Sequence, residues 1–356
     1  MNGDSRLCHS KKILSKRNIS YIIELQEKGI QNFVGPVITL DLTRKCNYDC
    51  SYCIDQKIVN TKESYTVNEI SYEKITELLK LLRLNGVRNI ELTGGGEPTL
   101  YTRFEEICRY LDGLGYKLAL VTNGSRLHHF FGLFEDINFS WVRVSLDAGT
   151  ELTYSKMHGV VAERFATVLS NIRKISSCTS IGISYIVCKE NIKEIKTAYE
   201  LACGVGAKYF ELKMMRDWSS NVVLDESQAI MQQLTQIMDY EIDSTKIIWP
   251  TEFADEYSDR KQRCWASDLR TVITPEGMYR CTYSRGGAKM PLPKNVEEFI
   301  KYRNILNKER VCSKECTFCT RNKLNSMVDE LINNPDYMKE TIEKYTDEVI
   351  DDEEWI

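Results

Sequence analysis

The stretch VITLDLTRKCNYDCSYC, residues 37–53, joins a short apolar run to three closely spaced cysteines. The run at 37–42 has the length and the aliphatic composition of a buried strand. Five similar runs follow it, at 89–94, 117–124, 141–147, 181–187 and 209–215. Amphipathic segments lie between several of them, at 72–86, 104–115 and 191–206. Strands that alternate with helices in this way indicate a parallel α/β sheet.

Six β/α units are fewer than the eight of a closed TIM barrel. We therefore predict an α/β fold with a partial (β/α)6 TIM barrel core, whose functional residues lie at the C-terminal ends of the strands. A hairpin is predicted at 269–281, inside a Cys-rich segment that we expect to form a small C-terminal domain. The predicted organisation is a helical lead-in at 1–35, the core at 36–250, the Cys-rich domain at 251–325 and a helical, acidic tail at 326–356.

The composition is that of an ordinary globular protein, since 42% of the 356 residues are apolar and 28% are charged. The net charge of −4 gives no indication of a nucleic-acid or membrane partner. Residues 1–18 lack the apolar core of a secretory signal, and no run of about 18 apolar residues could span a membrane. We therefore expect a cytoplasmic protein, whose thirteen cysteines bind metal or do redox chemistry rather than form disulfides.

The first cysteine set, Cys46, Cys50 and Cys53, directly follows the first predicted strand. Three thiolates can hold three corners of a cubane iron–sulfur cluster and leave one iron open to bind another molecule. A structural zinc ion takes four ligands, and no fourth lies nearby in the sequence. Zinc is therefore the alternative, and an iron–sulfur cluster is the prediction.

This CxxxCxxC motif, with an aromatic residue at Tyr52, resembles that of the radical S-adenosylmethionine (SAM) enzymes. The resemblance extends to TGGGEP at 93–98, TNG at 122–124 and SLD at 145–147, which end the second, third and fourth predicted strands. It implies a [4Fe–4S] cluster whose open iron binds SAM, and an electron donor such as flavodoxin or ferredoxin. Reductive cleavage of SAM would give a 5′-deoxyadenosyl radical, which takes a hydrogen atom from the substrate.

The resemblance also implies which residues bind SAM. The glycine-rich turn would hold the amino group of the methionine moiety, residues of the SLD element would lie near the ribose, and Asn123 of the TNG element also fits. Lys156 or His158 would lie near the carboxylate. Tyr52 would lie near the adenine or pack the cysteine loop. The predicted cofactor-binding residues are Tyr52, Gly94, Gly95, Gly96, Glu97, Pro98, Asn123, Ser145, Asp147 and Lys156.

A second cysteine set, Cys264, Cys281, Cys312, Cys316 and Cys319, spans the predicted hairpin and a later CxxxCxxC. Such paired sets can converge on one metal, and a structural zinc is the alternative. The region resembles the SPASM and Twitch domains of radical SAM enzymes, which carry auxiliary clusters. Five cysteines are too few for two cubanes, so we expect one auxiliary [4Fe–4S] cluster. Its best ligand set is Cys264, Cys281, Cys316 and Cys319, with Cys312 spare or replacing one of them.

The second set departs from these families in one respect and imitates the first motif in another. Three residues, rather than the usual four, separate Gly277 from Cys281. The spacing at 312–319 repeats that of the first set, but no strand or glycine-rich turn accompanies it. We therefore reject a second SAM site there.

Substrate contacts are predicted in the loop at 214–220, where Arg216, Asp217 and Trp218 suit a sugar, cyclitol or nucleotide. An ordinary capping loop is the alternative. Arg143 either faces SAM or the substrate, or forms a structural ion pair. Cys188 ends the fifth predicted strand, where a thiol could return a hydrogen atom to a substrate radical. The predicted catalytic residues are Cys188, Arg216 and Asp217.

The predicted function is that of a radical SAM oxidoreductase acting on a small polar metabolite. We favour oxidative dehydrogenation, with the auxiliary cluster accepting the second electron, over redox-neutral epimerisation. A peptide maturase is a further alternative, but it predicts a peptide-recognition module, for which the lead-in at 1–35 is too short. A non-catalytic zinc-binding interaction protein would leave the SAM-like motifs unexplained.

Overall fold

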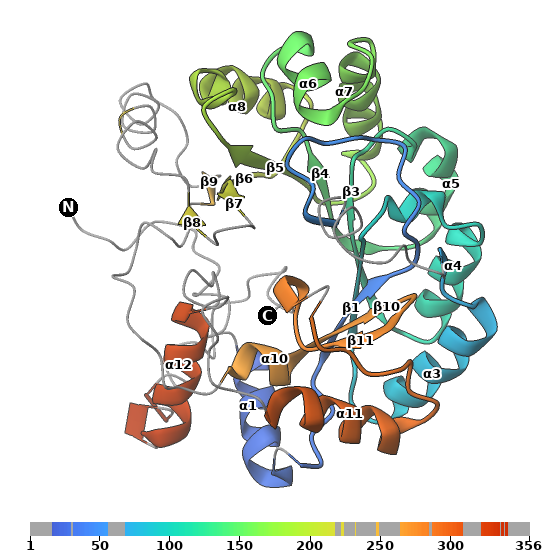
Figure 1. Cartoon of the computed structure of the whole chain (residues 1–356), viewed down its shortest axis with the longest axis vertical. Helices are drawn as coiled ribbons and strands as arrows, with labels where there is room; N and C mark the ends of the chain where they lie inside the picture. Colours follow the sequence, from blue (N-terminus) through green and yellow to red (C-terminus); the bar gives the residue numbers. More distant parts are fainter. Residues whose placement is uncertain are drawn as a thin grey trace.

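A curved sheet forms the centre of the molecule (Figure 1). The computed structural model describes residues 16–29, 31–55, 68–217, 222–223, 232, 247–248, 264–284, 287–308, 322–334, 336–337 and 339–340. Within this part of the chain the sheet has the strand order β11-β10-β1-β2-β3-β4-β5-β6-β9. Its strands are β1 (Val37–Asp41), β2 (Asn89–Thr93), β3 (Lys117–Thr122), β4 (Phe139–Ser145), β5 (Ile181–Val187), β6 (Tyr209–Met214), β9 (Ile247–Ile248), β10 (Arg270–Thr274) and β11 (Gly277–Tyr279).

Helices cover the convex side of this sheet in Figure 1. The six predicted strands correspond to β1–β6, and every neighbouring pair among them is parallel. The sheet ends at β11 and β9 without closing, which confirms the predicted partial barrel. The helices that follow these strands are α3 (Tyr72–Leu84), α4 (Phe104–Gly113), α5 (Phe131–Asp136), α6 (Glu151–His158), α7 (Arg164–Ile175) and α8 (Ile195–Gly204).

The strands present different side chains to their two faces, because successive residues of a strand point to opposite sides. On β6, Phe210, Leu212 and Met214 belong to the main hydrophobic core, which includes apolar residues of the covering helices. Glu211 and Lys213 alternate with them and therefore point to the opposite side, the concave side of the sheet. We call this concave side the inner face. On β6 it carries the charged residues Glu211 and Lys213, whereas the outer face carries apolar ones.

The predicted hairpin is present, and it extends the barrel sheet. Strand β10 pairs in parallel with β1, with Val37 opposite Arg270, and in antiparallel fashion with β11. Gly277 opens β11 with φ 133°, and an added Cβ would lie 2.1 Å from the Met290 carbonyl oxygen. Only glycine fits this turn without a backbone shift. The Cys-rich segment thus shares a sheet with the core, although the division of the chain into four segments stays a prediction.

A separate hydrophobic cluster lies at the lower end of Figure 1, where helices from the two ends of the chain pack together. Ile22 and Leu25 of α1 (Lys16–Lys28) pack with Val328 of α12 (Asn322–Asn333) and Leu269 of α10 (Trp265–Leu269). Helix α11 (Val296–Lys308) covers the sheet near β11. The remainder of the predicted lead-in and the acidic end of the tail lie outside the described residues.

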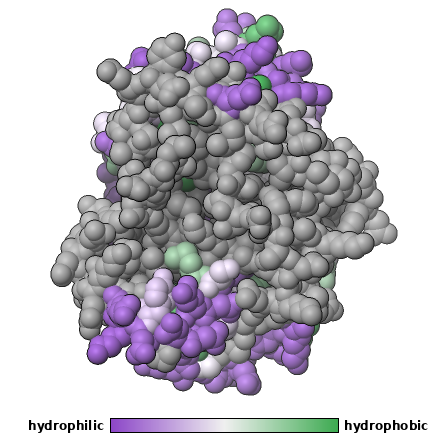
Figure 2. Space-filling model, turned by 90° about the vertical axis from the view of Figure 1, so that its left-hand side faces the viewer, coloured by the Kyte–Doolittle hydropathy of each residue, from purple (hydrophilic) through white to green (hydrophobic). Residues whose placement is uncertain are grey.

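The outer surfaces of the helices are polar, as expected for elements that bury one face. In Figure 2, hydrophilic side chains dominate the described surface toward α6, α7 and α8 at the top and toward α1 and α12 at the bottom. Among the described residues, no helix is both long and apolar enough to cross a membrane.

Candidate active site at the C-terminal ends of the strands

The three cysteines of the first set lie on the loop that follows β1. All three are free thiols; Cys46 is exposed, whereas Cys50 and Cys53 are half-buried. Burial raises the pKa of Cys46 to about 11, and the neighbouring Cys53 adds to the shift. Among the described residues, no three cysteine, histidine or acidic side chains gather as the ligands of a single metal ion. A cubane is larger than one ion and holds its thiolates further apart, so this donor set fits a cluster better than zinc.

The glycine-rich turn after β2 packs directly against this cysteine loop. The Gly96 N–H donates to the Thr43 carbonyl at 3.1 Å, and the Glu97 N–H donates to the Lys45 carbonyl at 2.8 Å. A Cβ added to Gly96 would lie 2.2 Å from the Lys45 oxygen. The glycine therefore permits two chain segments to approach each other. This role within the protein is additional to the SAM contact predicted from the sequence.

The Glu97 carboxylate points into the protein, away from any ligand. Its Oε1 accepts hydrogen bonds from the hydroxyls of Thr99, at 2.7 Å, and Thr122, at 2.6 Å. Its Oε2 accepts from the Asn123 N–H at 2.8 Å. Burial raises the pKa of Glu97, although these donors oppose the shift. Glu97 thus joins the ends of β2 and β3, and Pro98 beside it is buried; that these residues bind the cofactor stays a prediction.

Asn123 ties the end of β3 to the cysteine loop. Its Nδ2 donates to Oδ1 of Asn47 at 2.9 Å, and Asn47 lies next to Cys46. The Asn47 amide in turn donates to the Ser125 hydroxyl at 3.0 Å. The sequence prediction placed Asn123 at the site but not its contact with Asn47, because an exposed asparagine in a loop carries no pattern.

Asp147 occupies the turn after β4, where it is completely buried. Its Oδ2 accepts a 2.5 Å hydrogen bond from the Tyr52 hydroxyl, and its Oδ1 accepts one of the same length from the Ile186 N–H. The residue has φ 54°, a conformation that the surrounding contacts must hold in place. These contacts use both carboxylate oxygens of Asp147 within the protein, and its role near the SAM ribose stays a prediction. Tyr52 packs the cysteine loop through its hydroxyl.

His158, at the end of α6, completes this buried group. Its Nε2 lies 3.1 Å from the Leu146 carbonyl, so Nε2 carries the proton and donates. Its Nδ1 lies 3.2 Å from both the Cys50 Sγ and the Tyr52 hydroxyl. Burial lowers the pKa of His158. The residue is 1% exposed and therefore contacts a cluster cysteine rather than the SAM carboxylate.

The C-terminal end of α6 also holds the cysteine loop through its backbone. The Asp49 N–H donates to the His158 carbonyl at 3.0 Å, and the Ser51 N–H donates to the Met157 carbonyl at 3.1 Å. Gly159 has φ 62° and lies so close that a Cβ would stand 2.4 Å from the Asp49 oxygen. Lys156 is exposed on the same helix.

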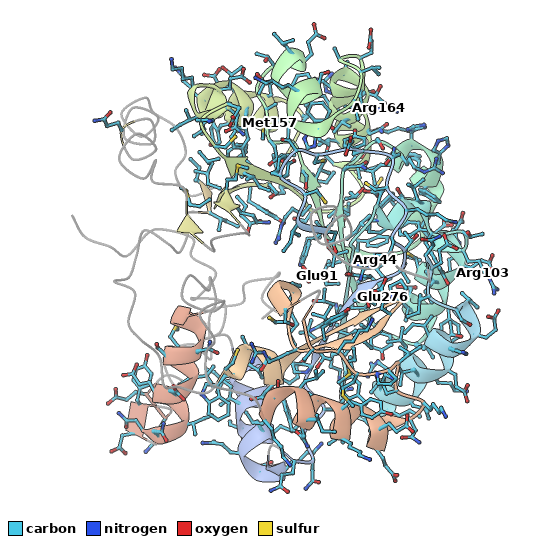
Figure 3. All side chains as sticks on the ribbon, in the orientation of Figure 1. Arg44, Glu91, Arg103, Met157, Arg164 and Glu276 are labelled. Carbon is cyan, nitrogen blue, oxygen red and sulfur yellow. The ribbon has the colours of Figure 1, made fainter. Side chains whose placement is uncertain are left out.

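A buried ion-pair network joins the cysteine loop to the hairpin. Nη2 of Arg44 lies 2.5 Å from Oε2 of Glu276, and the two side chains lie together in Figure 3. Nη1 of the same guanidinium lies 3.0 Å from Asp55 and 3.5 Å from Asp41. Arg44 precedes Cys46 by two residues, and Glu276 lies in the β10–β11 turn. The network therefore fixes the hairpin relative to the loop.

The inner face beside the cysteine loop carries charged and hydroxyl side chains. Nε of Arg143 lies 2.9 Å from Oε2 of Glu211, and Nζ of Lys213 lies 3.2 Å from the same oxygen. Ser145 of β4 stands opposite Ser184 of β5, which stands opposite Glu211 in turn. Arg143 thus forms the ion pair that the sequence left as one of its two possibilities.

The predicted catalytic residues follow two different strands, Cys188 directly after β5 and residues 216–217 after β6. Cys188 is 1% exposed, and its Sγ lies 3.8 Å from Sδ of Met157. Burial raises the pKa of its thiol to about 12. The thiol is thus enclosed by protein, and its catalytic role stays a prediction. Arg216 and Asp217 form the strand β7 (Arg216–Asp217), which pairs with β8 (Val222–Val223), and Trp218 lies outside the described residues.

Part of the second cysteine set is described. Cys264 precedes α10 and Cys281 follows β11, and both are half-buried free thiols. Burial raises the pKa of Cys264, and the charge of Cys281 adds to the shift. The other three predicted ligands, Cys312, Cys316 and Cys319, lie outside the described residues.

Comparison with protein families matches residues 40–202 to the model described as "Radical SAM superfamily". Three curated proteins with similar sequences are an Fe-coproporphyrin III synthase of Methanosarcina barkeri, an S-adenosylmethionine-dependent nucleotide dehydratase of a Thermoplasmatales archaeon and a GTP 3′,8-cyclase of Campylobacter fetus. Their identities are 28%, 33% and 29%, over 47%, 29% and 51% of this chain. The alignments cover 40%, 35% and 48% of the relatives, so the chain spans about half of their length or less.

Solved structures show the same fold at low sequence identity. Streptococcus suis SuiB bound to S-adenosylmethionine has a TM-score of 0.61 at 14% identity, over 82% of this chain and 70% of SuiB. SuiB bound to the precursor peptide SuiA has a TM-score of 0.63 at 15% identity, over 85% and 73% of the two chains. The protein anSMEcpe with bound AdoMet has a TM-score of 0.59 at 15% identity, over 82% and 84%. These likenesses extend the shared fold well beyond residue 202.

Proposed function

We propose that this chain, which matches the radical SAM superfamily model over residues 40–202, generates a 5′-deoxyadenosyl radical at Cys46, Cys50 and Cys53 and dehydrogenates a small polar metabolite. The cofactors of the family are SAM and a [4Fe–4S] cluster. The observation that supports the proposal is the arrangement of the cysteine loop. Three free thiols lie within eight residues at the C-terminal end of β1, and three separate segments hold them there.

When bound and reduced, the cluster supplies the electron that cleaves SAM into methionine and the radical. The chain's own residues keep the loop in one position. The glycine-rich turn holds its first part, the end of α6 holds its middle, and Tyr52 fixes its last part through Asp147. Gly94, Gly95 and Gly96 can contact SAM through their backbone, since the Glu97 side chain is occupied elsewhere.

A small polar substrate is supported by the charged and hydroxyl side chains of the inner face. Two of the similar proteins are named for nucleotide substrates, a dehydratase and a cyclase. A nucleotide-like substrate therefore agrees with both observations. The burial of Cys188 removes the thiol that would have served epimerisation, which favours dehydrogenation over the redox-neutral reaction.

Dehydrogenation requires an acceptor for the second electron, and we place an auxiliary cluster at Cys264, Cys281, Cys316 and Cys319. Two of these cysteines flank the hairpin that extends the barrel sheet, since Cys264 precedes α10 and Cys281 follows β11. The buried pair of Arg44 with Glu276 joins that hairpin to the first cysteine loop. Four cysteine ligands would leave no iron open, so this cluster would transfer electrons rather than bind substrate.

A peptide maturase is the second candidate, because a structure of the same fold contains a precursor peptide. At 15% sequence identity, this comparison supports a shared fold and not a shared substrate. An extended peptide and a small metabolite differ in the area that they cover, so SAM cleavage stimulated by pooled nucleotides, rather than by peptides, separates the two candidates.

The test is the iron and sulfide content per chain after anaerobic reconstitution, with SAM cleavage measured on the same samples. Two cubanes predict about eight irons in the wild type and about four in the Cys46→Ala/Cys50→Ala/Cys53→Ala variant. SAM cleavage should be absent from that variant. Cys203→Ala, at an exposed cysteine of α8, is the matched control and should keep both properties. About four irons that fall to none, with zinc retained, would refute the electron-acceptor role.

A further inference from the structure

Two cations share one carboxylate on the inner face of the sheet. Arg143 on β4 and Lys213 on β6 both approach the same Oε2 atom of Glu211, at 2.9 and 3.2 Å. The Arg143 guanidinium also lies over the Trp141 ring, 4.7 Å from its centroid, and is 14% exposed. Lys213 is 37% exposed. Arg143 is therefore the enclosed partner of Glu211, and Lys213 is the accessible one.

The positive charge of Lys213 is only partly compensated. Burial lowers the pKa of Lys213, while Glu211 opposes this and Arg143 adds to it. Asp147 is the next carboxylate to act on Lys213, but the Tyr52 hydroxyl and the Ile186 N–H occupy its two oxygens. Glu211 is thus the partner of two cations, and the Lys213 ammonium is exposed enough to take an anionic group of a ligand as a second partner.

We propose that Lys213, positioned by Glu211 and Arg143, binds an anionic group of the substrate, a phosphate or a carboxylate, on the inner face between β4 and β6. The inference rests on the proposed function and names the substrate class for it. A lysine ammonium is a compact charge that pairs with phosphate, and it can donate up to three hydrogen bonds. Ser184 and Ser145 lie in register with Glu211 on the next two strands, where they can donate further hydrogen bonds.

This subsite lies on a different strand from the turn that we expect to hold the amino group of SAM. That turn follows β2, and three strands lie between β2 and β6. Titration of SAM into the Lys213 variants tells whether the lysine meets SAM or the substrate.

A glycine on the intervening strand makes room for this arrangement. Gly182 of β5 lies opposite Tyr209 of β6, and a Cβ at Gly182 would stand 1.9 Å from the Tyr209 ring. The ring therefore lies across β5, on the inner face and beside Arg143, whose pKa Tyr209 helps to raise. The absence of a side chain at Gly182 therefore leaves room for the Tyr209 ring, which supports the Arg143 guanidinium.

The experiment measures binding of inorganic pyrophosphate and of malonate to the anaerobically reconstituted protein by isothermal titration calorimetry, at two ionic strengths. We expect saturable binding of one probe, weakened by salt, and the tighter probe identifies the anionic group. Lys213→Gln should weaken this binding about tenfold or more, as expected for one charged hydrogen bond. Lys208→Gln, at an exposed lysine just before β6, should leave it unchanged. Lys213→Arg keeps the charge and should bind within about threefold of the wild type.

Three outcomes would overturn the proposal: no saturable binding of either probe, equal weakening in the Lys208→Gln control, or a loss of SAM affinity in Lys213→Gln as large as the loss of probe affinity. The last result would assign the lysine to the SAM carboxylate. Thermal unfolding of each variant shows whether it is folded, and Lys213→Arg tests the charge if the glutamine variant is not. Failure of SAM cleavage in the wild type would instead refute the proposed function and leave the anion titration interpretable.

Discussion

Replacing Gly96 by alanine tests how the cysteine loop is held. The new Cβ would lie 2.2 Å from the Lys45 carbonyl oxygen and 2.7 Å from the Arg44 carbonyl carbon. Both are backbone atoms, so one of the two segments must move by about 1 Å to restore ordinary contact. That movement breaks or lengthens the hydrogen bonds from the Gly96 and Glu97 N–H groups. At about 1 kcal/mol for each bond, with strain added, we expect a loss of about 2–4 kcal/mol in the free energy of unfolding.

Gly132→Ala is the matched control, because an added Cβ there meets nothing within 4 Å. It lies inside α5, where alanine should stabilise the helix by up to about 1 kcal/mol. Urea denaturation measures both free energies, and iron content after reconstitution reports the position of the loop. Gly96→Ala should lose iron, whereas Gly132→Ala should not. If the two variants have the same stability and the same iron content, the reasoning about the loop is wrong.

Three further predictions concern buried groups. A double-mutant cycle on Arg44→Met and Glu276→Gln should show coupling, because either single change breaks a buried pair at a cost of about 3–5 kcal/mol; additive effects would contradict this. Burial alone would raise the pKa of Glu276, but the hydrogen bond and the charge of Arg44 lower it. The contribution of this ion pair to the free energy of unfolding should therefore be lost as the pH falls below 4.5. Glu276→Gln should make the free energy of unfolding less dependent on pH in that range. Iodoacetamide should alkylate exposed Cys203 and spare Cys188 in the folded protein, as mass spectrometry of peptides can show.

The six barrel strands can be predicted from the sequence because each is a short run rich in apolar residues, and amphipathic helical segments lie between several of these runs. The parallel order of β1–β6 follows from the helices between them. The partner of the hairpin does not follow, since β10 pairs with β1 across most of the chain and no local pattern records a contact of that kind. Long-range pairing is a property of the assembled sheet.

The candidate site, too, could be predicted from the sequence only in part. Cys46, Cys50 and Cys53 stand out because their spacing has few structural uses. Glu97 and Asp147 also stand out, but a motif does not say which way a carboxylate points. In the structure both are buried beneath the site and hold its segments together. The contact between His158 and Cys50 could not be predicted from the sequence, because a single histidine at a helix end has many ordinary uses.

The pairing of β10 with β1 also bears on how the chain acquires its structure during synthesis. Until residues 270–274 leave the ribosome, β1 has one free edge of unpaired backbone groups, in the middle of the protein's most apolar sheet. Such an edge is a template for pairing with another chain. The nascent barrel therefore depends on its last strands for protection against aggregation. A fragment that stops before residue 270 should aggregate, even though it would retain all six strands of the barrel.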